Sequence, residues 1–200
     1  MDNINLPELH FDESNHAYTV YGMSLPSVTS IMRPLSDRQY GGINKDTLGN
    51  AANRGTQVHQ AIEMYLLYGM DDIPEGLEGY YEAFKNWLPD IPERQSECKL
   101  YHQILRYAGT VDVIYPDDYG VVIVDFKTTS TGIEMLERVQ TEAYARIIDS
   151  LGLIVTKKVI VHLKSNGTYK ESIYESSDNQ AWEVFTSLMN IDRYLTQYKK

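Results

Sequence analysis

Two short runs of β-branched residues, "VDVIY" at 111–115 and "VVIVDFK" at 121–127, constrain this chain more than any other feature. Such runs are typical of buried strands, yet Asp112 lies inside the first run, and Asp125 and Lys127 lie inside the second. Burying an unpaired charge is strongly unfavourable, so each of these side chains needs a partner. The fold therefore has to bring compensating groups to this part of the chain.

The spacing of the two runs predicts a β-hairpin in which the two aspartates face each other. With the turn centred just after Asp118, Asp112 is opposite Asp125, and opposite residues have Cβ atoms roughly 4.5–5.5 Å apart. Side chains alternate along a strand, so Lys127 shares the face of Asp125 while Phe126 points into the core. One face of the hairpin thus carries two carboxylates and an ammonium group.

Two interpretations of this face remain open on spacing alone. Two neighbouring carboxylates are commonly held by a divalent cation, and a lysine beside them stabilises an anion or positions a water, which suits metal-assisted hydrolysis of a phosphodiester. Alternatively, Lys127 neutralises one aspartate in an ion pair that has only a structural role.

Composition narrows the classes of protein to which the chain can belong. Its 200 residues fit one domain, or one domain with a small appendage, and its single cysteine, Cys98, excludes an internal disulfide and a multi-cysteine metal cluster. No apolar run is long enough for a bilayer span and no signal peptide is evident, so we expect a cytoplasmic protein without membrane contact. The net charge of −10 argues mildly against nucleic-acid binding by bulk electrostatics, although acidic metal ligands count toward that total.

The order of predicted elements indicates an α/β or α+β fold, with a mixed central β-sheet flanked by helices. Helices precede three strands, and a helix, two strands and a final helix follow. The N-terminal part is predicted as a hairpin around Asp12–Asn15, a short helix opened by Ser27 or Thr29 and stopped near Pro34, a loop at 36–50, and a helix that ends at Gly69. After Gly69 the sequence predicts a helix closed by Pro89, a strand at 94–102 and the hairpin described above. These are followed by a helix with Gly152 as its C-cap, a hairpin with its turn at 165–167, and a helix with Asp178 as its N-cap.

Four blocks of the sequence occur in an order that resembles the PD-(D/E)xK nuclease superfamily, specifically its RecB-like, phage-type exonuclease branch. The blocks are "NRGTQVHQAIEMYL", "GTVDVI", "VDFKTT" and "QTEAYA". The resemblance covers residues 16–146. It implies a restriction-endonuclease-like core and a single nuclease domain over 1–200, in which 1–50 form an N-terminal hairpin and loop appendage and 51–200 form the nuclease core.

The resemblance also implies a set of site residues. The catalytic residues would be Asp112, Asp125 and Lys127, and the metal ligands would be His59, Asp112, Asp125 and the backbone carbonyl of Phe126. One or two Mg²⁺ or Mn²⁺ ions suit these ligands, because oxygen donors favour Mg²⁺ and an imidazole favours Mn²⁺. The residues implied for substrate binding are Gln140, Tyr144 and Arg54.

Several of these residues have a second interpretation. Glu63 shares a helix face with His59 and either assists the metal or forms a salt bridge, and Glu97 either extends the acidic cluster or faces solvent. Tyr144 either orients the substrate or packs in the core, and Arg54 either binds a phosphate or caps a loop. The other histidines are predicted to be structural: His10, His16, His102 and His162.

The resemblance implies a metal-dependent deoxyribonuclease, most simply an exonuclease that hydrolyses phosphodiester bonds in phage-type DNA recombination, repair or processing. The alternative is a catalytically inactive nucleic-acid-binding or partner-binding protein that retains the nuclease fold. Expected partners are DNA and a separate recombination or helicase protein, with a homo-oligomer suggested by analogy and no iron–sulfur cluster. If the protein is phage-encoded, its expected location is the cytoplasm of a bacterial host.

Overall fold

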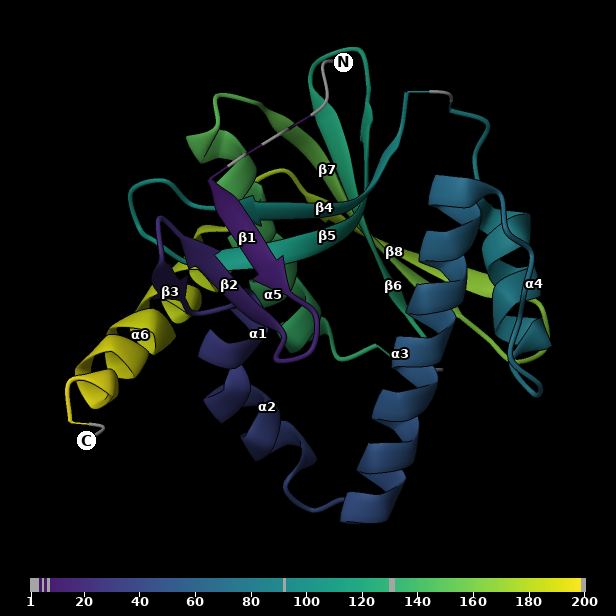
Figure 1. The fold of residues 1–200 in the computed structure, drawn as a ribbon, viewed down its shortest axis with the longest axis horizontal. Coiled ribbons are helices and arrows are strands. Elements are labelled where there is room, and N and C mark those ends of the chain that lie inside the picture. Colours follow the sequence, from purple (N-terminus) through teal and green to yellow (C-terminus); the bar gives the residue numbers. More distant parts are fainter. Residues whose placement is uncertain (1–3, 5, 7, 92, 130–131, 199–200) are drawn as a thin grey trace.

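A computed structural model describes residues 4, 6, 8–91, 93–129 and 132–198 of the chain. It contains a five-stranded mixed sheet with helices on both faces, and a separate three-stranded antiparallel sheet near the N-terminus (Figure 1). This architecture confirms the predicted α/β (α+β) class. Within the described residues, no helix combines the length and hydrophobicity that crossing a bilayer requires.

The elements follow the predicted order, with β3 and α2 as two elements that were not predicted. The small sheet consists of β1 (Leu9–Asp12), β2 (Ala17–Val20) and β3 (Met23–Leu25). The main sheet consists of β4 (Gln95–Tyr101), β5 (Ala108–Pro116), β6 (Val121–Lys127), β7 (Val155–Leu163) and β8 (Tyr169–Glu175). The helices are α1 (Val28–Ile31), α2 (Arg33–Tyr40), α3 (Lys45–Tyr68), α4 (Glu78–Trp87), α5 (Glu134–Ser150) and α6 (Asn179–Thr196).

The main sheet has the strand order β4-β5-β6-β7-β8, and the β6–β7 pair is its parallel pair. A parallel pair needs a crossover, which α5 supplies. In the β5–β6 hairpin, Val113 pairs with Val124 and Ile114 pairs with Ile123. Continued by one residue, this register puts Asp112 opposite Asp125, so the predicted hairpin register is confirmed.

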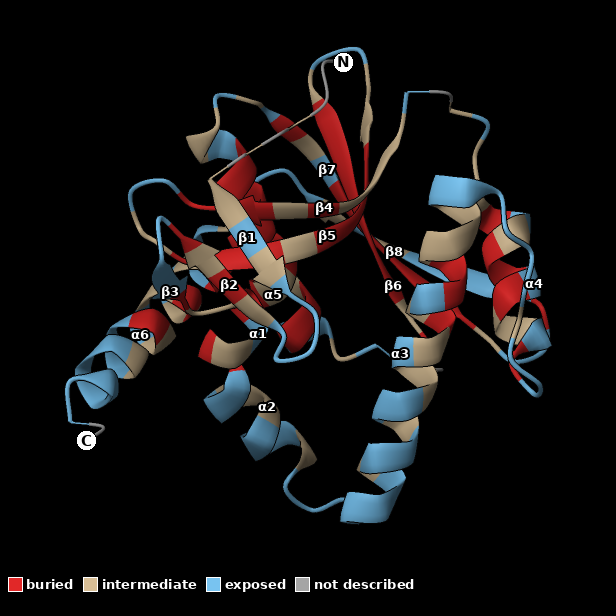
Figure 2. Cartoon of the chain, in the orientation of Figure 1, coloured by how far each residue is buried: buried red, intermediate tan, exposed pale blue. Residues whose placement is uncertain are grey.

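The main sheet separates two hydrophobic cores, and its strands carry much of the buried surface (Figure 2). On one face, α1, α5 and α6 pack through residues such as Ile147 and Phe185. On the other face, α3 and α4 enclose an aromatic cluster in which Phe126 lies 5.5 Å from Phe84 and 5.1 Å from Trp87, centroid to centroid. Phe126 therefore points into a core, as predicted, and anchors the end of β6.

Residues 36–50 are mostly helical, and the predicted loop is limited to 41–44. The preceding helix, α1, ends at Ile31, close to Pro34 as predicted, but Pro34 itself lies in the first turn of α2, where its missing N–H leaves no bond unmade. Helix α2 was not recognised from the sequence because it is polar. It buries none of its residues, so it has no hydrophobic period. Helix α3 also begins earlier than predicted, at Lys45, where the Asn44 side chain accepts from the Asp46 N–H.

Several helix ends agree with the sequence signals. Ser27 caps α1 by accepting from the Ser30 N–H, Asp178 caps α6 by accepting from the Ala181 N–H, and α3 ends at Gly69. The predicted C-cap of α5 is displaced by one position. Leu151 is the C-cap, and Gly152 follows it with φ +82°, a left-handed conformation that glycine adopts without a Cβ penalty.

A buried ion pair that no sequence pattern predicted joins the main sheet to both C-terminal helices. Lys158 on β7 and Glu142 on α5 are each 0% exposed, and the Lys158 ammonium donates to Glu142 Oε2. Glu142 also accepts from Arg146 Nε at 2.8 Å and from the Asp178 backbone N–H at 2.9 Å. The carboxylate thus links β7, α5 and the N-terminus of α6.

Removing Lys158 takes one cation from the buried Glu142 carboxylate and leaves Arg146 and the Asp178 N–H as its remaining partners. Lys158→Met is therefore expected to lower the free energy of unfolding by about 1.5–3 kcal/mol, measured by urea denaturation. The matched control is Lys157→Met, which changes the exposed neighbouring lysine and should leave stability nearly unchanged. Equal stabilities of the two variants would contradict a structural role for the buried pair.

Candidate metal centre

Acidic, basic and imidazole groups converge at the C-terminal end of β6. Asp112 comes from β5, Asp125 and Lys127 come from β6, His59 comes from α3, and Gln140 comes from α5. The aspartates are 8% and 4% exposed, so solvent does little to neutralise them. Their compensation has to come from the neighbouring elements, as the sequence predicts.

His59 contacts two of the predicted metal ligands. Its Nδ1 atom lies 3.4 Å from Asp112 Oδ1, and its Nε2 atom lies 2.9 Å from the Phe126 carbonyl oxygen. The second oxygen of Asp112 accepts the Phe126 backbone N–H at 2.6 Å. The ring of His59 thus bridges a carboxylate of β5 and a carbonyl of β6, and the three groups form one cluster.

Asp125 is held from two directions. Lys127 Nζ lies 2.6 Å from Asp125 Oδ2, and the Gln140 amide donates to Asp125 Oδ1 at 3.0 Å. The same amide lies 3.2 Å from the Tyr144 hydroxyl. Tyr144 is only 4% exposed, which favours the packing role over direct contact with a substrate. Gln140 and Lys127 together fix the orientation of the Asp125 carboxylate.

Glu97 belongs to the acidic cluster and does not simply face solvent. Ser96 pairs with Val113 and Cys98 pairs with Val111, which puts Glu97 opposite Asp112. Ligand atoms of Glu97, His59 and Asp112 lie within 4.8 Å of one another, close enough to hold one metal ion. Glu97 also has φ +50°, a left-handed conformation that is unusual for a non-glycine residue within a strand.

Mutual charge and burial shift the pKa values of the cluster. Burial alone would lower the pKa of His59, but the Asp112 and Asp125 carboxylates outweigh it and raise this pKa to about 9. Burial and the nearby Asp112 and Glu63 raise the pKa of Glu97 to about 8. Burial also raises the pKa of Asp125 despite its contact with Lys127. The centre therefore retains protons at neutral pH.

Glu63 and Arg54 take different positions relative to this centre. Glu63 lies on α3 near enough to influence Glu97 electrostatically, which agrees with its place four residues after His59. Arg54 lies inside α3, not at a loop, and its guanidinium carbon is 5.6 Å from the ring centroid of Tyr80 on α4. The loop-capping interpretation of Arg54 is therefore wrong.

His162, which was predicted to be structural, is buried and has a charged neighbour. It is 2% exposed on β7, and its Nε2 atom lies 3.5 Å from Glu137 Oε1 on α5. The signal that identifies Asp125, a titratable residue within an apolar strand, was equally present in "VIVHL". By contrast, His102 Nδ1 accepts the Leu105 N–H at 3.1 Å in a turn, which agrees with a structural role.

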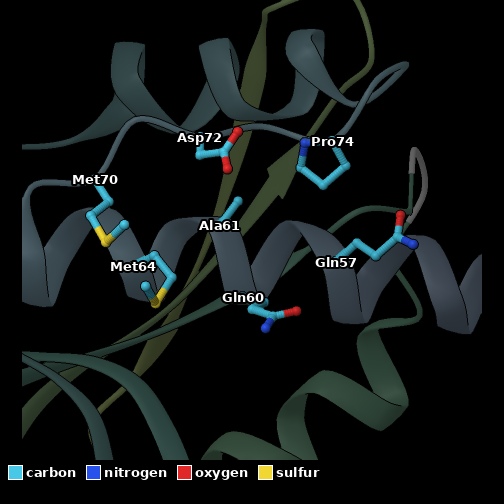
Figure 3. A pocket seen from close by; sticks show the side chains of 7 residues that line it. All are labelled: Gln57, Gln60, Ala61, Met64, Met70, Asp72 and Pro74. Carbon is cyan, nitrogen blue, oxygen red and sulfur yellow. The ribbon is translucent and has the colours of Figure 1, made fainter.

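A pocket lies on another side of α3, between this helix and the segment that leads to α4 (Figure 3). Gln57, Gln60 and Met64 line it from α3, and Met70 and Asp72 line it from the connecting segment. Among the described residues that line this pocket, none is a predicted site residue. The pocket and the acidic cluster are therefore separate features of α3.

The chemistry of the acidic cluster fits a divalent cation. The ligand atoms that lie close together are carboxylate oxygens of Asp112 and Glu97 and an imidazole nitrogen of His59, and the Phe126 carbonyl oxygen contacts the same imidazole ring. Asp125, also a predicted ligand, lies outside this group of three, and its oxygens contact Lys127 and Gln140. Carboxylate and carbonyl oxygens suit Mg²⁺ and Mn²⁺, and an imidazole favours Mn²⁺.

Comparisons with known proteins do not name a family. No family model matches the chain, and no curated protein matches it. Among solved structures, the chain is similar to SSO0001, with a TM-score of 0.47 and 14% identity over 82% of this chain and 74% of that one. A likeness this distant carries no inference about function.

A cation that binds the cluster has to displace protons, which makes its affinity depend on pH. His59 and Glu97, with pKa values of about 9 and about 8, are largely protonated at pH 7 and deprotonate as the pH rises. The affinity for Mn²⁺ is therefore expected to increase from pH 6 to pH 9, with proton release on binding. Calorimetry in buffers of different ionisation enthalpy measures both, and an affinity independent of pH would contradict this centre.

Proposed function

We propose that this protein is a divalent-metal-dependent deoxyribonuclease of the PD-(D/E)xK type, acting as an exonuclease. The observation that supports this proposal best is the convergence of His59 with Asp112, the Phe126 carbonyl and the Asp125–Lys127 pair. His59 and Phe126 are 67 residues apart in sequence, so local structure does not account for their contact. These are the residues that the family resemblance implies for metal binding and catalysis.

The ligands of the proposed nuclease are His59, Asp112, Asp125 and the Phe126 carbonyl, with Glu97 as an additional carboxylate. A bound Mg²⁺ or Mn²⁺ would supply charge neutralisation at the phosphate and would lower the pKa of water. The protein's own contribution is to hold the carboxylates in place. Gln140 orients Asp125, and the Phe126 N–H orients Asp112.

Lys127 acts in this proposal through its positive charge. Burial alone would lower its pKa, but Asp125, Asp112 and Glu137 outweigh that effect and raise the pKa above its ordinary value. The ammonium therefore stays protonated at neutral pH, which suits a hydrogen-bond donor to a phosphate oxygen or an attacking water. It does not suit a general base, which has to accept a proton in its resting state.

The expected substrate is DNA. Gln140 remains a candidate to contact the nucleic-acid strand as well as Asp125. Arg54 remains a candidate phosphate contact, because its position over the ring of Tyr80 does not occupy its N–H groups. With a net charge of −10, the chain needs a local positive surface, a partner protein or an oligomer to retain DNA at physiological salt. A separate recombination or helicase protein and a homo-oligomer remain proposals.

One alternative has a specific observation in its favour. The 2.6 Å contact between Lys127 and Asp125 and the 3.4 Å contact between His59 and Asp112 already pair the buried charges. A catalytically inactive protein that keeps the fold to bind a nucleic acid or a partner would need no more than this ion network. Dependence of cleavage on a divalent metal separates the two functions.

The deciding measurement is degradation of linear and circular, single- and double-stranded DNA, and of RNA, with Mg²⁺, Mn²⁺ or EDTA. Metal-dependent loss of linear DNA alone is the result expected of an exonuclease. Lys127→Ala should reduce cleavage by at least about a hundredfold while it keeps Mn²⁺ binding, because it removes a charge donor and no ligand. Asp112→Asn and Asp125→Asn should lose both.

The matched control is Lys157→Ala, which removes an exposed lysine at the opposite end of the sheet and should cleave like the wild type. If no nucleic acid is cleaved with either metal, the nuclease proposal is wrong and the ion network is the better explanation. If Lys127→Ala cleaves normally, the role given to Lys127 is wrong.

A further inference from the structure

A second buried polar cluster lies beside Lys127 and outside the proposed metal centre. It is built around Glu137 on α5, which is 4% exposed and lies 3.5 Å from His162 Nε2 on β7. The Tyr174 hydroxyl on β8 donates to Glu137 Oε2 at 2.7 Å, and the Ser172 hydroxyl lies 3.3 Å from His162 Nε2. Two strands thus hold the Glu137 carboxylate in place.

The topology puts this cluster next to Lys127. His162 is the direct partner of Lys127 in the parallel β6–β7 ladder. Glu137 precedes Gln140 by one helical turn, so both point from the same side of α5, and Gln140 reaches Asp125.

Gly132 packs closely against the cluster. A Cβ added to Gly132 would lie 2.2 Å from Glu137 Oε1 and 2.5 Å from His162 Cε1, both far below ordinary contact distance. The backbone at Gly132 therefore covers the carboxylate and the imidazole closely.

The Glu137 carboxylate can hold the Lys127 ammonium in place once a metal ion has weakened the attraction between Lys127 and Asp125. Lys127 Nζ lies 2.6 Å from Asp125 Oδ2, an atom that belongs to a proposed metal ligand. A divalent cation on Asp125 would offset the negative charge that attracts Lys127 and would repel its ammonium. A second fixed anion that is not a ligand can then keep the ammonium near the centre.

We propose that Glu137, held by His162 and Tyr174, is a positioning residue that keeps the Lys127 ammonium at the metal centre when a cation occupies Asp125. This inference rests on the proposed nuclease function, in which Lys127 acts on the scissile phosphate. Because Glu137 acts through Lys127, loss of its charge slows the chemical step and leaves metal and DNA binding unchanged.

The test compares Glu137→Gln with wild type and with Glu134→Gln, the same substitution at an exposed position in the first turn of α5. With linear DNA and saturating Mn²⁺, Glu137→Gln should lower kcat by about tenfold to a hundredfold, while KM and the Kd for Mn²⁺ change less than about twofold. Glu134→Gln should match wild type in all three. An unchanged kcat for Glu137→Gln, or a Kd that weakens in proportion to kcat, would overturn the inference.

A second variant keeps the inference testable if Glu137→Gln does not fold. Tyr174→Phe retains the Glu137 charge and removes one hydrogen bond to it, so kcat should fall by about tenfold with KM unchanged. Its control is Tyr169→Phe on the same strand, where the tyrosine is exposed and kcat should not change. If both tyrosine variants keep the wild-type kcat, the inference is wrong.

The two proposals fail in distinguishable ways. A wild-type protein that cleaves no nucleic acid defeats the nuclease function and the positioning role together. A wild-type protein that cleaves DNA and loses activity in Lys127→Ala, but keeps its kcat in Glu137→Gln, defeats the positioning role alone.

Discussion

Lys127 and Asp125 meet at 2.6 Å at the end of β6, in a sheet that helices cover on both faces. A charge buried there is tolerated only when another charge or a hydrogen bond compensates it. Three elements supply the compensating groups. Lys127 of β6 and Gln140 of α5 contact Asp125, and His59 of α3 contacts Asp112. Both helices are therefore tied to the sheet by polar contacts as well as by hydrophobic packing.

Phe126 connects the polar cluster to the hydrophobic core. Its side chain is anchored among Phe84 and Trp87, its N–H binds Asp112, and its carbonyl oxygen contacts His59. The alternation of a strand makes this possible, because Asp125 and Lys127 face away from the side that Phe126 occupies. Aromatic packing thereby fixes the backbone that presents the polar groups, and a change in that packing would move the cluster.

Helix α5 compensates titratable groups of β6 and β7 at three places. Gln140 reaches Asp125, Glu142 pairs with Lys158, and Glu137 approaches His162. The pair with Lys158 has the character of a structural link, since it joins β7, α5 and the start of α6 within the core. The other two contacts lie at the end of β6 where Lys127 is located, which is why they enter the proposed function and not only the stability of the fold.

The sequence by itself determined the features that depend on near neighbours. The β5–β6 register follows from a period of two on either side of a short turn, so the opposition of Asp112 and Asp125 was predictable, as was the cap at Asp178. Helix α2 was not, because an exposed polar helix has no hydrophobic period. His59 entered the predicted site only through a family resemblance.

The tertiary structure alone decided which distant groups meet. Glu97 was left between two interpretations until β4 placed it opposite Asp112, and the buried partner of His162 was unknown until α5 brought Glu137 beside it. The same packing put Lys158 against Glu142 and buried Tyr144 at 4% exposure. The physical reason is that strand alternation, turns and caps are set within a few residues, whereas the partner of a buried charge depends on how helices and strands far apart in sequence pack together.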